Sequence, residues 1–178
     1  MAHEQILSSY IVTFHTFALL SGKHPNPFFT QVIESNRTFF VEKTPLEIMR
    51  DSCAHYRTNL EAIIESSKKD LKKRHKPPIM LTHSHNKPLL FFPLLSPSLH
   101  QNTWIAFHAV KDAHPHKDGV SLVLKNNAKL LLKISMNTVY RQVTLSHVLS
   151  QRFDNAQEEL RSSYSMVMEP KHSDSPTS

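Results

Sequence analysis

Glycine is scarce in this sequence, and its scarcity excludes several classes of function. Only two glycines occur among the 178 residues, Gly22 and Gly119. Loops that cradle phosphate groups need backbone without a Cβ near the ligand, so the usual nucleotide-binding motifs cannot be built here. The G-x-S-x-G turn that presents a catalytic serine is also missing from the sequence. We therefore expect neither an enzyme nor a protein that uses a cofactor.

Cysteine and long apolar runs are equally scarce. The single cysteine, Cys53, excludes an internal disulfide and a cysteine-based zinc site, and it is typical of a reducing compartment. The N-terminus lacks the basic and apolar regions of a signal peptide. The longest apolar run, Leu89 to Leu95, is too short to span a bilayer and contains Pro93. The sequence predicts a cytoplasmic protein with no membrane association.

Positive charge is plentiful but concentrated in one place. The segment 66–76 holds six lysine or arginine residues against the single Asp70, a net charge of +5 in a chain whose total is +6. Such density favours a polyanionic partner, because each neutralised phosphate releases counterions. The alternative is a solvated basic helix face, since charge runs are common. The candidate phosphate contacts of this basic segment are Lys68, Lys69, Lys72, Lys73, Arg74 and Lys76.

Strand patterns occupy most of the chain. Alternating, β-branched or aromatic runs separated by turn residues predict them. Pro93 removes a backbone donor, so its strand is expected at a sheet edge or at a bulge. The last two strands form a hairpin, and a three-residue loop sets Leu124 opposite Leu130 and Leu122 opposite Leu132. The predicted strands are 10–20, 28–33, 38–42, 79–81, 89–95, 103–110, 120–125 and 129–134.

Helix patterns occur in three places. Thr44, Pro45 and Glu47 have the types and spacing of a capping box with proline in the first turn, so a helix is predicted from there to about Tyr56. A second helix starts at Leu60 and ends by about His75, because Pro77 disfavours helix just before it. A third is predicted over 138–161.

The sum is an α+β fold with mostly antiparallel strands, two inserted helices and one C-terminal helix. We expect a single domain over 1–162 and a disordered, serine-rich tail over 163–178. The tail contains apolar residues that no core explains, so we interpret it either as a short docking motif or as an inert tail. The residues of the motif are Met166, Val167, Met168, Pro170 and Lys171.

Histidines and aromatic residues admit a functional and a structural interpretation. The pairs His83/His85 and His114/His116 lie in predicted loops with few carboxylates nearby, and we expect no metal site there. His15 and His108 are interpreted as ordinary strand residues rather than as a catalytic pair. Three rings could stack on bases if exposed, but strand spacing favours the core. They are Phe91, Phe92 and Trp104.

Several segments together resemble a known family. They are Pro45-Leu46-Glu47-Ile48 with Asp51-Ser52-Cys53, His75-Lys76-Pro77-Pro78-Ile79-Met80, Phe91-Phe92-Pro93-Leu94-Leu95-Ser96, Trp104-Ile105 with His108, Ile134-Ser135-Met136-Asn137, Gln142-Val143 and Met168-Glu169-Pro170-Lys171. Their order and spacing over roughly residues 35–171 resemble those of ComK proteins, the competence transcription factors of Gram-positive bacteria. The resemblance implies a transcriptional activator that binds A/T-rich promoter boxes as a homo-oligomer in the nucleoid, largely through the minor groove. It also implies an adaptor that delivers the protein to a Clp-type protease.

One departure from the family pattern keeps two functions open. ComK proteins have a glycine-rich basic stretch after the cysteine, whereas Arg57, Ala62 and Ser66 stand in that stretch here. The basic charge lies a few residues later, in the basic segment. The first function is a DNA-binding activator of competence genes that uses this segment. The second is a diverged relative without DNA binding that acts through protein contacts, with the protease adaptor or with other ComK-like chains.

Overall fold

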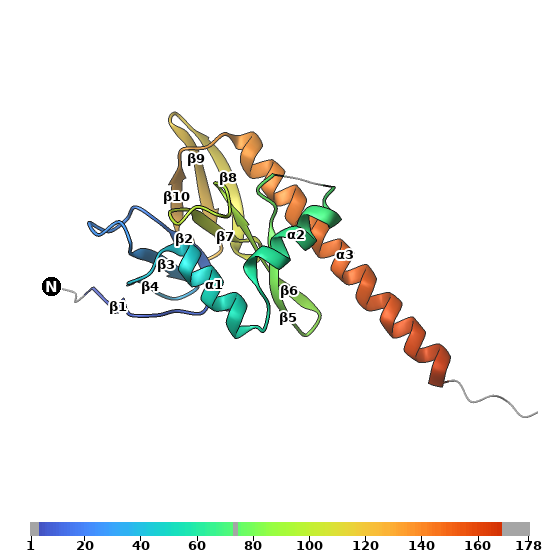
Figure 1. Cartoon of the computed structure of the whole chain (residues 1–178). Helices are drawn as coiled ribbons and strands as arrows, with labels where there is room; N and C mark the ends of the chain where they lie inside the picture. Colours follow the sequence, from blue (N-terminus) through green and yellow to red (C-terminus); the bar gives the residue numbers. More distant parts are fainter. Residues whose placement is uncertain (1–3, 73–74, 169–178) are drawn as a thin grey trace, which may run out of the picture.

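The computed structural model describes residues 4–72 and 75–168 and shows a mixed α+β fold, as the sequence predicts (Figure 1). Most strands pair antiparallel in two sheets, and a long C-terminal helix extends away from them. The elements are β1 (Ile6–Leu7), β2 (Thr16–Leu20), β3 (Thr30–Glu34), β4 (Thr38–Val41), α1 (Pro45–His55), α2 (Leu60–Asp70), β5 (Ile79–Ser84), β6 (Lys87–Pro93), β7 (Thr103–Ala106), the 3-10 helix η1 (Phe107–Ala109), β8 (Val110–His116), β9 (Gly119–Leu124), β10 (Lys129–Leu132) and α3 (Met136–Met168).

The larger sheet has seven strands in the order β1-β4-β3-β2-β7-β6-β5, and the smaller has the order β10-β9-β8. Among the strands of the described residues, only β1 pairs in parallel, with β4. The N-terminal and C-terminal halves of the larger sheet meet at one antiparallel seam, where Leu19 of β2 lies opposite Trp104 of β7. The strand with Pro93 is not an edge strand, so the first of the two predicted alternatives is wrong, but its ladder with β5 does contain a register shift, between Met80 and Thr82. Its proline lies at the end of β6, beyond the last residue paired with β5, so no bond to β5 is lost.

One hydrophobic core joins the two sheets. Every residue of β2 is buried, so both faces of this strand are covered. Helices α1 and α2 lie in front of the larger sheet in Figure 1. The smaller sheet contributes its own buried residues to the same core cluster. These are Val120, Leu122, Leu124 and Leu130.

The capping box of α1 is confirmed. Thr44 Oγ1 accepts from the backbone N–H of Glu47 at 3.3 Å, and Glu47 Oε2 accepts from the backbone N–H of Thr44 at 2.7 Å. Farther along α1, Ser52 Oγ accepts from the N–H of Val12 at 3.0 Å. Tyr56 OH, just past the helix, donates to Val12 O at 2.7 Å.

These contacts explain an error in the predicted first strand. The sequence predicts a strand over 10–20, but β2 begins only at Thr16. Side chains of α1 and its C-cap satisfy both backbone groups of Val12, so this part of the chain needs no strand partner. The predicted hairpin of β3 and β4 is confirmed, with Val32 opposite Phe39.

Helix α2 ends five residues before the predicted His75. Leu71 is buried and its N–H still donates to Ser67 O at 2.8 Å, but Lys72 has a left-handed backbone with φ of 58°. A residue in this conformation after the last helical turn is a common way to end a helix, and glycine usually occupies it. The left-handed turn, rather than Pro77, therefore ends the helix.

Strand β8 was predicted as a loop. Its seven residues are mostly polar and exposed, because β8 is an edge strand of the smaller sheet, and they show no apolar alternation. The strand predicted over 103–110 is interrupted, since β7 ends at Ala106 and η1 follows.

The β9–β10 hairpin forms, but in a register different from the predicted one. Leu122 lies opposite Leu130 and Val120 opposite Leu132, a shift of two residues. The loop again has three residues but starts one residue earlier than predicted, because Leu124 N donates to Ala128 O at 2.9 Å and Asn127 has φ of 66°. An even shift keeps each side chain on its predicted face, so the apolar face still meets the core.

Helix α3 is longer than the predicted 138–161 and continues to Met168. The serines that suggested a disordered tail are accommodated in the helix. Ser163 Oγ donates to Glu159 O at 2.9 Å, and Ser165 Oγ donates to Arg161 O at 3.1 Å. The tail predicted from 163 is thus helical at its start, and 169–178 lie outside the described residues. The proposed division at residue 162 stays a prediction.

The core interpretation of the aromatic residues is confirmed. Trp104, Phe91 and Phe92 are 0% exposed, which excludes base stacking by these rings in this conformation. Cys53 is also buried, and burial raises the pKa of its thiol to about 12. A thiol in this state is a small hydrophobic residue rather than a nucleophile.

Candidate nucleic-acid interface

The basic segment connects the C-terminal end of α2 to β5. Lys68 and Lys69 lie in the last turn of α2, and Lys72 occupies the left-handed position after it. Lys76 is exposed and lies next to buried Pro77, where the chain enters β5. Two of the predicted contacts lie outside the described residues, namely Lys73 and Arg74.

The lysines of this segment differ in their partners. Lys68 Nζ lies 2.8 Å from Glu65 Oε1, and this hydrogen bond holds the pKa of the Glu65 carboxyl below its ordinary value. Among the described residues, Lys69, Lys72 and Lys76 have no ion-pair partner, and all three are exposed. These three cations are therefore available to a phosphate, whereas Lys68 must first leave Glu65.

Part of the charge pattern also stabilises α2 itself. Glu61 lies in its first turn, and Lys68 and Lys69 lie in its last, an arrangement that complements the helix dipole. This supports the interpretation of a solvated helix face for those two lysines. Lys72 and Lys76 lie beyond the helix, so helix stabilisation does not account for them.

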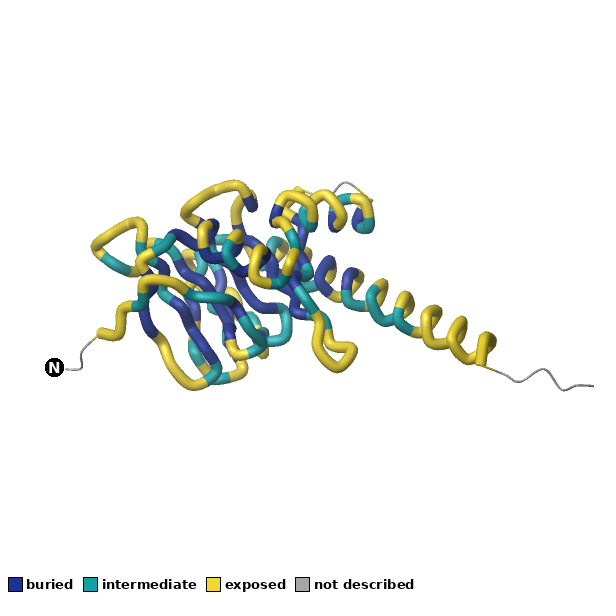
Figure 2. The backbone as a smooth tube through the Cα atoms, turned by 60° about the horizontal axis from the view of Figure 1, so that its bottom comes forward, coloured by how far each residue is buried: buried dark blue, intermediate teal, exposed yellow. Residues whose placement is uncertain are grey.

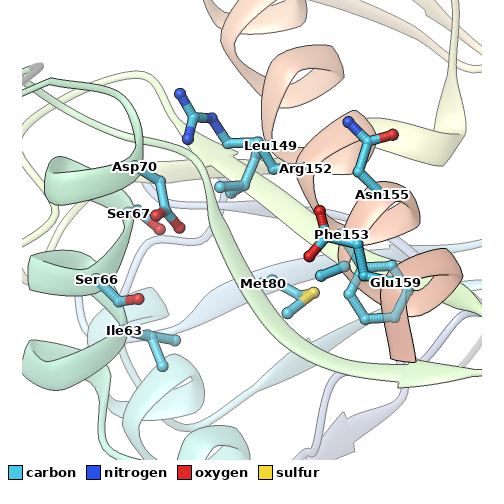
Figure 3. Close-up of a pocket in the computed structure, with 11 residues that line it drawn as sticks. Ile63, Ser66, Ser67, Asp70, Met80, Leu149, Arg152, Phe153, Asn155 and Glu159 are labelled. Carbon is cyan, nitrogen blue, oxygen red and sulfur yellow. The ribbon is translucent and has the colours of Figure 1, made fainter. Parts of the chain in front are cut away.

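A groove of about 570 Å³ separates α2 from α3 beside this segment (Figure 3). Met80 of β5 lies between its walls, and Arg152 extends from α3 toward α2. The lining also contains Asp70 and Glu159, so carboxylates outnumber cations. This groove does not favour an anion, and phosphate contacts belong on the outer side of the basic segment.

A buried glutamine fixes the end of the basic segment to the fold. Gln142 of α3 donates from Nε2 to the carbonyl oxygens of Lys76 and Pro93, both at 3.0 Å. Its side chain is 2% exposed, so these bonds form away from water. The position of Lys76 thus depends directly on α3 and β6.

The candidate docking residues form the free end of α3. Met166, Val167 and Met168 are helical and each about 80% exposed. The last turns of α3 contain only exposed residues, and the helix projects away from the sheets (Figure 2). Pro170 and Lys171 lie outside the described residues. The motif is therefore a helix surface at least to Met168, not part of a disordered tail as the sequence predicted.

Several histidines lie elsewhere than predicted. His83, His114 and His116 belong to β5 and β8 rather than to loops, while His85 lies in the turn between β5 and β6. Within the described parts of the chain, the closest histidine–carboxylate contact is His114 Nε2 to Asp112 Oδ2 at 3.1 Å. In the parts of the chain that the structure describes, no three His, Cys, Asp or Glu side chains are placed to hold a metal ion.

His15 and His108 are not strand residues, contrary to prediction. His15 lies in the turn before β2, and His108 lies in η1. His108 Nε2 donates to Phe14 O at 2.8 Å, and burial lowers the pKa of its ring.

None of the helices over 4–72 and 75–168 is both long and apolar enough to cross a bilayer.

The structure also brings together lysines that the sequence scatters. Lys23, Lys129 and Lys133 line one groove of about 750 Å³, together with the exposed Leu95 and Leu131. We call it the β10 groove. Sequence reasoning missed it because its residues come from distant segments, and only the pairing of β10 at the edge of the smaller sheet brings them together.

Comparisons with known proteins agree on one family. The family model described as "ComK protein" matches residues 7–158 of this chain. A curated relative, the competence transcription factor of Bacillus subtilis, is 29% identical over 150 residues. The match covers 84% of this chain and 77% of the relative. No solved structure matches the chain.

Proposed function

Because this chain belongs to the ComK family, we propose that it is a regulator of competence-gene transcription that binds A/T-rich double-stranded DNA. The similar protein of Bacillus subtilis carries the name of a transcription factor, which supports a role in transcription rather than in catalysis. Activation of promoters, homo-oligomer formation and location at the nucleoid are parts of the same proposal.

The exposed, unpaired cations of the basic segment are the observation that carries the DNA-binding part. Lys69 lies in the last turn of α2, and Lys72 and Lys76 follow it between α2 and β5. The bonds from Gln142 hold the end of that turn, so less ordering is needed when a phosphate binds Lys76. Contacts of this kind position a protein on DNA, while groove width and deformability supply the A/T preference.

Titration of labelled duplexes tests the proposal directly. The full chain is mixed with an A/T-rich and a G/C-rich duplex of equal length, each at two salt concentrations, and binding is followed by gel shift. We expect tighter binding to the A/T-rich duplex and a steep loss of affinity as salt rises. Equal affinity for both duplexes would contradict minor-groove selection, and no binding at low salt would reject DNA binding altogether.

A second candidate function rests on the free end of α3. Three adjacent side chains about 80% exposed, Met166, Val167 and Met168, make no contribution to the core. We propose that this end binds the adaptor of a Clp-type protease, with or without DNA binding. One face of a helix can bury such residues in an apolar groove of a partner.

Removal of residues 164–178 should therefore lengthen the lifetime of the protein in cells without unfolding the domain. The deleted part of α3 contains only exposed residues in the described range, so the urea midpoint should change little. Lifetime is measured by chase after synthesis is stopped. A matched control deletes 169–178 alone, which keeps the three apolar residues. If the longer deletion is degraded as fast as the full chain, docking belongs to another surface.

A further inference from the structure

Strand β10 has a free edge. On its other side it pairs with β9. The bond from Leu124 N to Ala128 O identifies Leu124 and Ala128 as a hydrogen-bonded pair of that ladder. Because bonded and non-bonded pairs alternate, Leu130 and Leu132 direct their backbone groups toward β9. Lys129 and Leu131 therefore direct their N–H and C=O groups outward. Among the described residues, nothing pairs with β10 on this side.

The two edges of the smaller sheet differ in how they are protected. At the β8 edge, Pro115 lies opposite Val120. Because Val120 directs its backbone groups toward β10, Pro115 and Val120 form a pair without hydrogen bonds. The backbone nitrogen of Pro115, which has no hydrogen, therefore faces away from β9, on the free side of β8. Proline at that place blocks strand addition. The β10 edge, Lys129–Leu132, has no proline. Only the β10 edge can accept a further strand with all of its backbone groups.

The free edge of β10 forms one side of the β10 groove. The opposite side comes from β2, β3 and the residues that follow β6. Apolar side chains lie along the groove, and Leu131 is 61% exposed beside it. A strand added to β10 would direct alternate side chains toward this apolar lining. The buried residues of that lining are Leu20, Ile33, Leu94 and Leu130.

The charge of the β10 groove is of one sign. Lys23, Lys129 and Lys133 line it, and no aspartate or glutamate does. A smaller adjoining hollow of about 160 Å³ contains Asp118 and His116 and shares Lys133. Even with Asp118 counted, cations are in excess around the free edge. The groove thus favours a partner that carries both apolar and acidic side chains.

We propose that the β10 groove binds an extended segment of a partner protein, in which acidic and apolar residues alternate, as an added strand of the smaller sheet. The apolar residues would contact the groove lining, and the acidic residues would contact the three lysines. A second copy of β10 is disfavoured, because it would bring Lys129 and the following Lys133 of the two copies close together. Duplex DNA offers phosphates but no backbone donors and acceptors for a strand edge.

Three fluorescent hexapeptides test this with the full chain. The first is Asp-Val-Asp-Val-Asp-Val, the second has the same sequence with all of its backbone amide nitrogens methylated, and the third is Lys-Val-Lys-Val-Lys-Val. Binding is followed by fluorescence anisotropy. We expect the first to bind, and the other two to bind at least about tenfold more weakly. Methylation removes strand bonds but keeps charge, so equal binding of the first two peptides would overturn strand addition.

Two protein variants locate the site. Lys129→Glu with Lys133→Glu should weaken binding of the acidic peptide by about tenfold or more, while Lys87→Glu with Lys111→Glu, outside the groove, should not. Leu131→Pro should also abolish binding, because it copies Pro115 at the other edge and removes no bond to β9. If urea titration shows that Leu131→Pro unfolds the chain, the variant Lys129→Glu with Lys133→Glu still tests whether the peptide binds in the β10 groove.

Other occupants give distinct results. If Lys129→Glu with Lys133→Glu weakens DNA binding but leaves peptide binding unchanged, the groove contacts DNA and the proposal is wrong. If Leu131→Pro lowers the mass of the protein in sedimentation equilibrium, a second copy occupies the edge and the proposal is again wrong. DNA binding through the basic segment is measured separately, so failure of one proposal does not imply failure of the other.

Discussion

Replacement of Lys69, Lys72 and Lys76 together by glutamine is expected to make the salt dependence of DNA binding shallower by about three units of slope. Each lysine is exposed and without an ion-pair partner in the described chain, so each can neutralise one phosphate. Between 50 and 200 mM salt, the unmodified protein should then lose roughly 40- to 60-fold more affinity than the variant. Gel-shift titrations at four salt concentrations give the slopes.

Two further variants sharpen this experiment. The control changes Lys87, Lys111 and Lys117 to glutamine, which removes the same charge from β6 and the smaller sheet. If its slope falls by as much as that of the first variant, net charge matters and the basic segment is not the contact surface. Glu65→Gln should act in the opposite direction. It releases Lys68 from its 2.8 Å ion pair and should steepen the slope by about one unit.

Replacement of Trp104 by alanine is expected to lower the free energy of unfolding by about 3–5 kcal/mol. The ring is 0% exposed and lies at the seam between β2 and β7, opposite Leu19 on one side and Pro93 on the other. Its loss leaves a cavity in the hydrophobic core beside this seam. Urea unfolding followed by far-ultraviolet circular dichroism measures the change.

Trp104→Phe is the matched control. Within the described residues Trp104 Nε1 has no hydrogen-bond partner, so a phenyl ring loses volume but no bond. We expect a loss of at most about 2 kcal/mol for this variant. Normal stability of Trp104→Ala combined with lost DNA affinity would show that the ring faces DNA, contrary to its burial in this structure.

Elements with strong local signals were predicted well. The capping box at Thr44 and Glu47 places the start of α1, because capping depends only on residues three apart. The burial of Trp104 follows from strand spacing with apolar neighbours. Strand β8 was missed because an exposed edge strand shows no apolar alternation. The predicted β9–β10 register was wrong by two residues. In both registers each side chain lies on the same face of the sheet, so the apolar pattern does not distinguish them.

The candidate sites were predictable only where they are local in sequence. The basic segment is a single run of residues, so composition found it. Composition did not show that Lys68 has a partner or that Lys72 ends α2 with a left-handed turn. The helical end of α3 was missed because serine suggests disorder, although its hydroxyl bonds to the carbonyl one turn earlier. The β10 groove requires tertiary pairing and has no local signal.

The seam between β2 and β7 has a consequence for synthesis of the chain. A ribosome adds roughly 5–20 residues per second, so about 4–17 s separate the completion of β2 from that of β7. During this time one edge of β2 is unpaired, although every residue of the strand is buried in the finished fold. Unpaired apolar edges recruit other chains. The interval of greatest aggregation risk therefore falls on the nascent polypeptide, before residue 106 has been added.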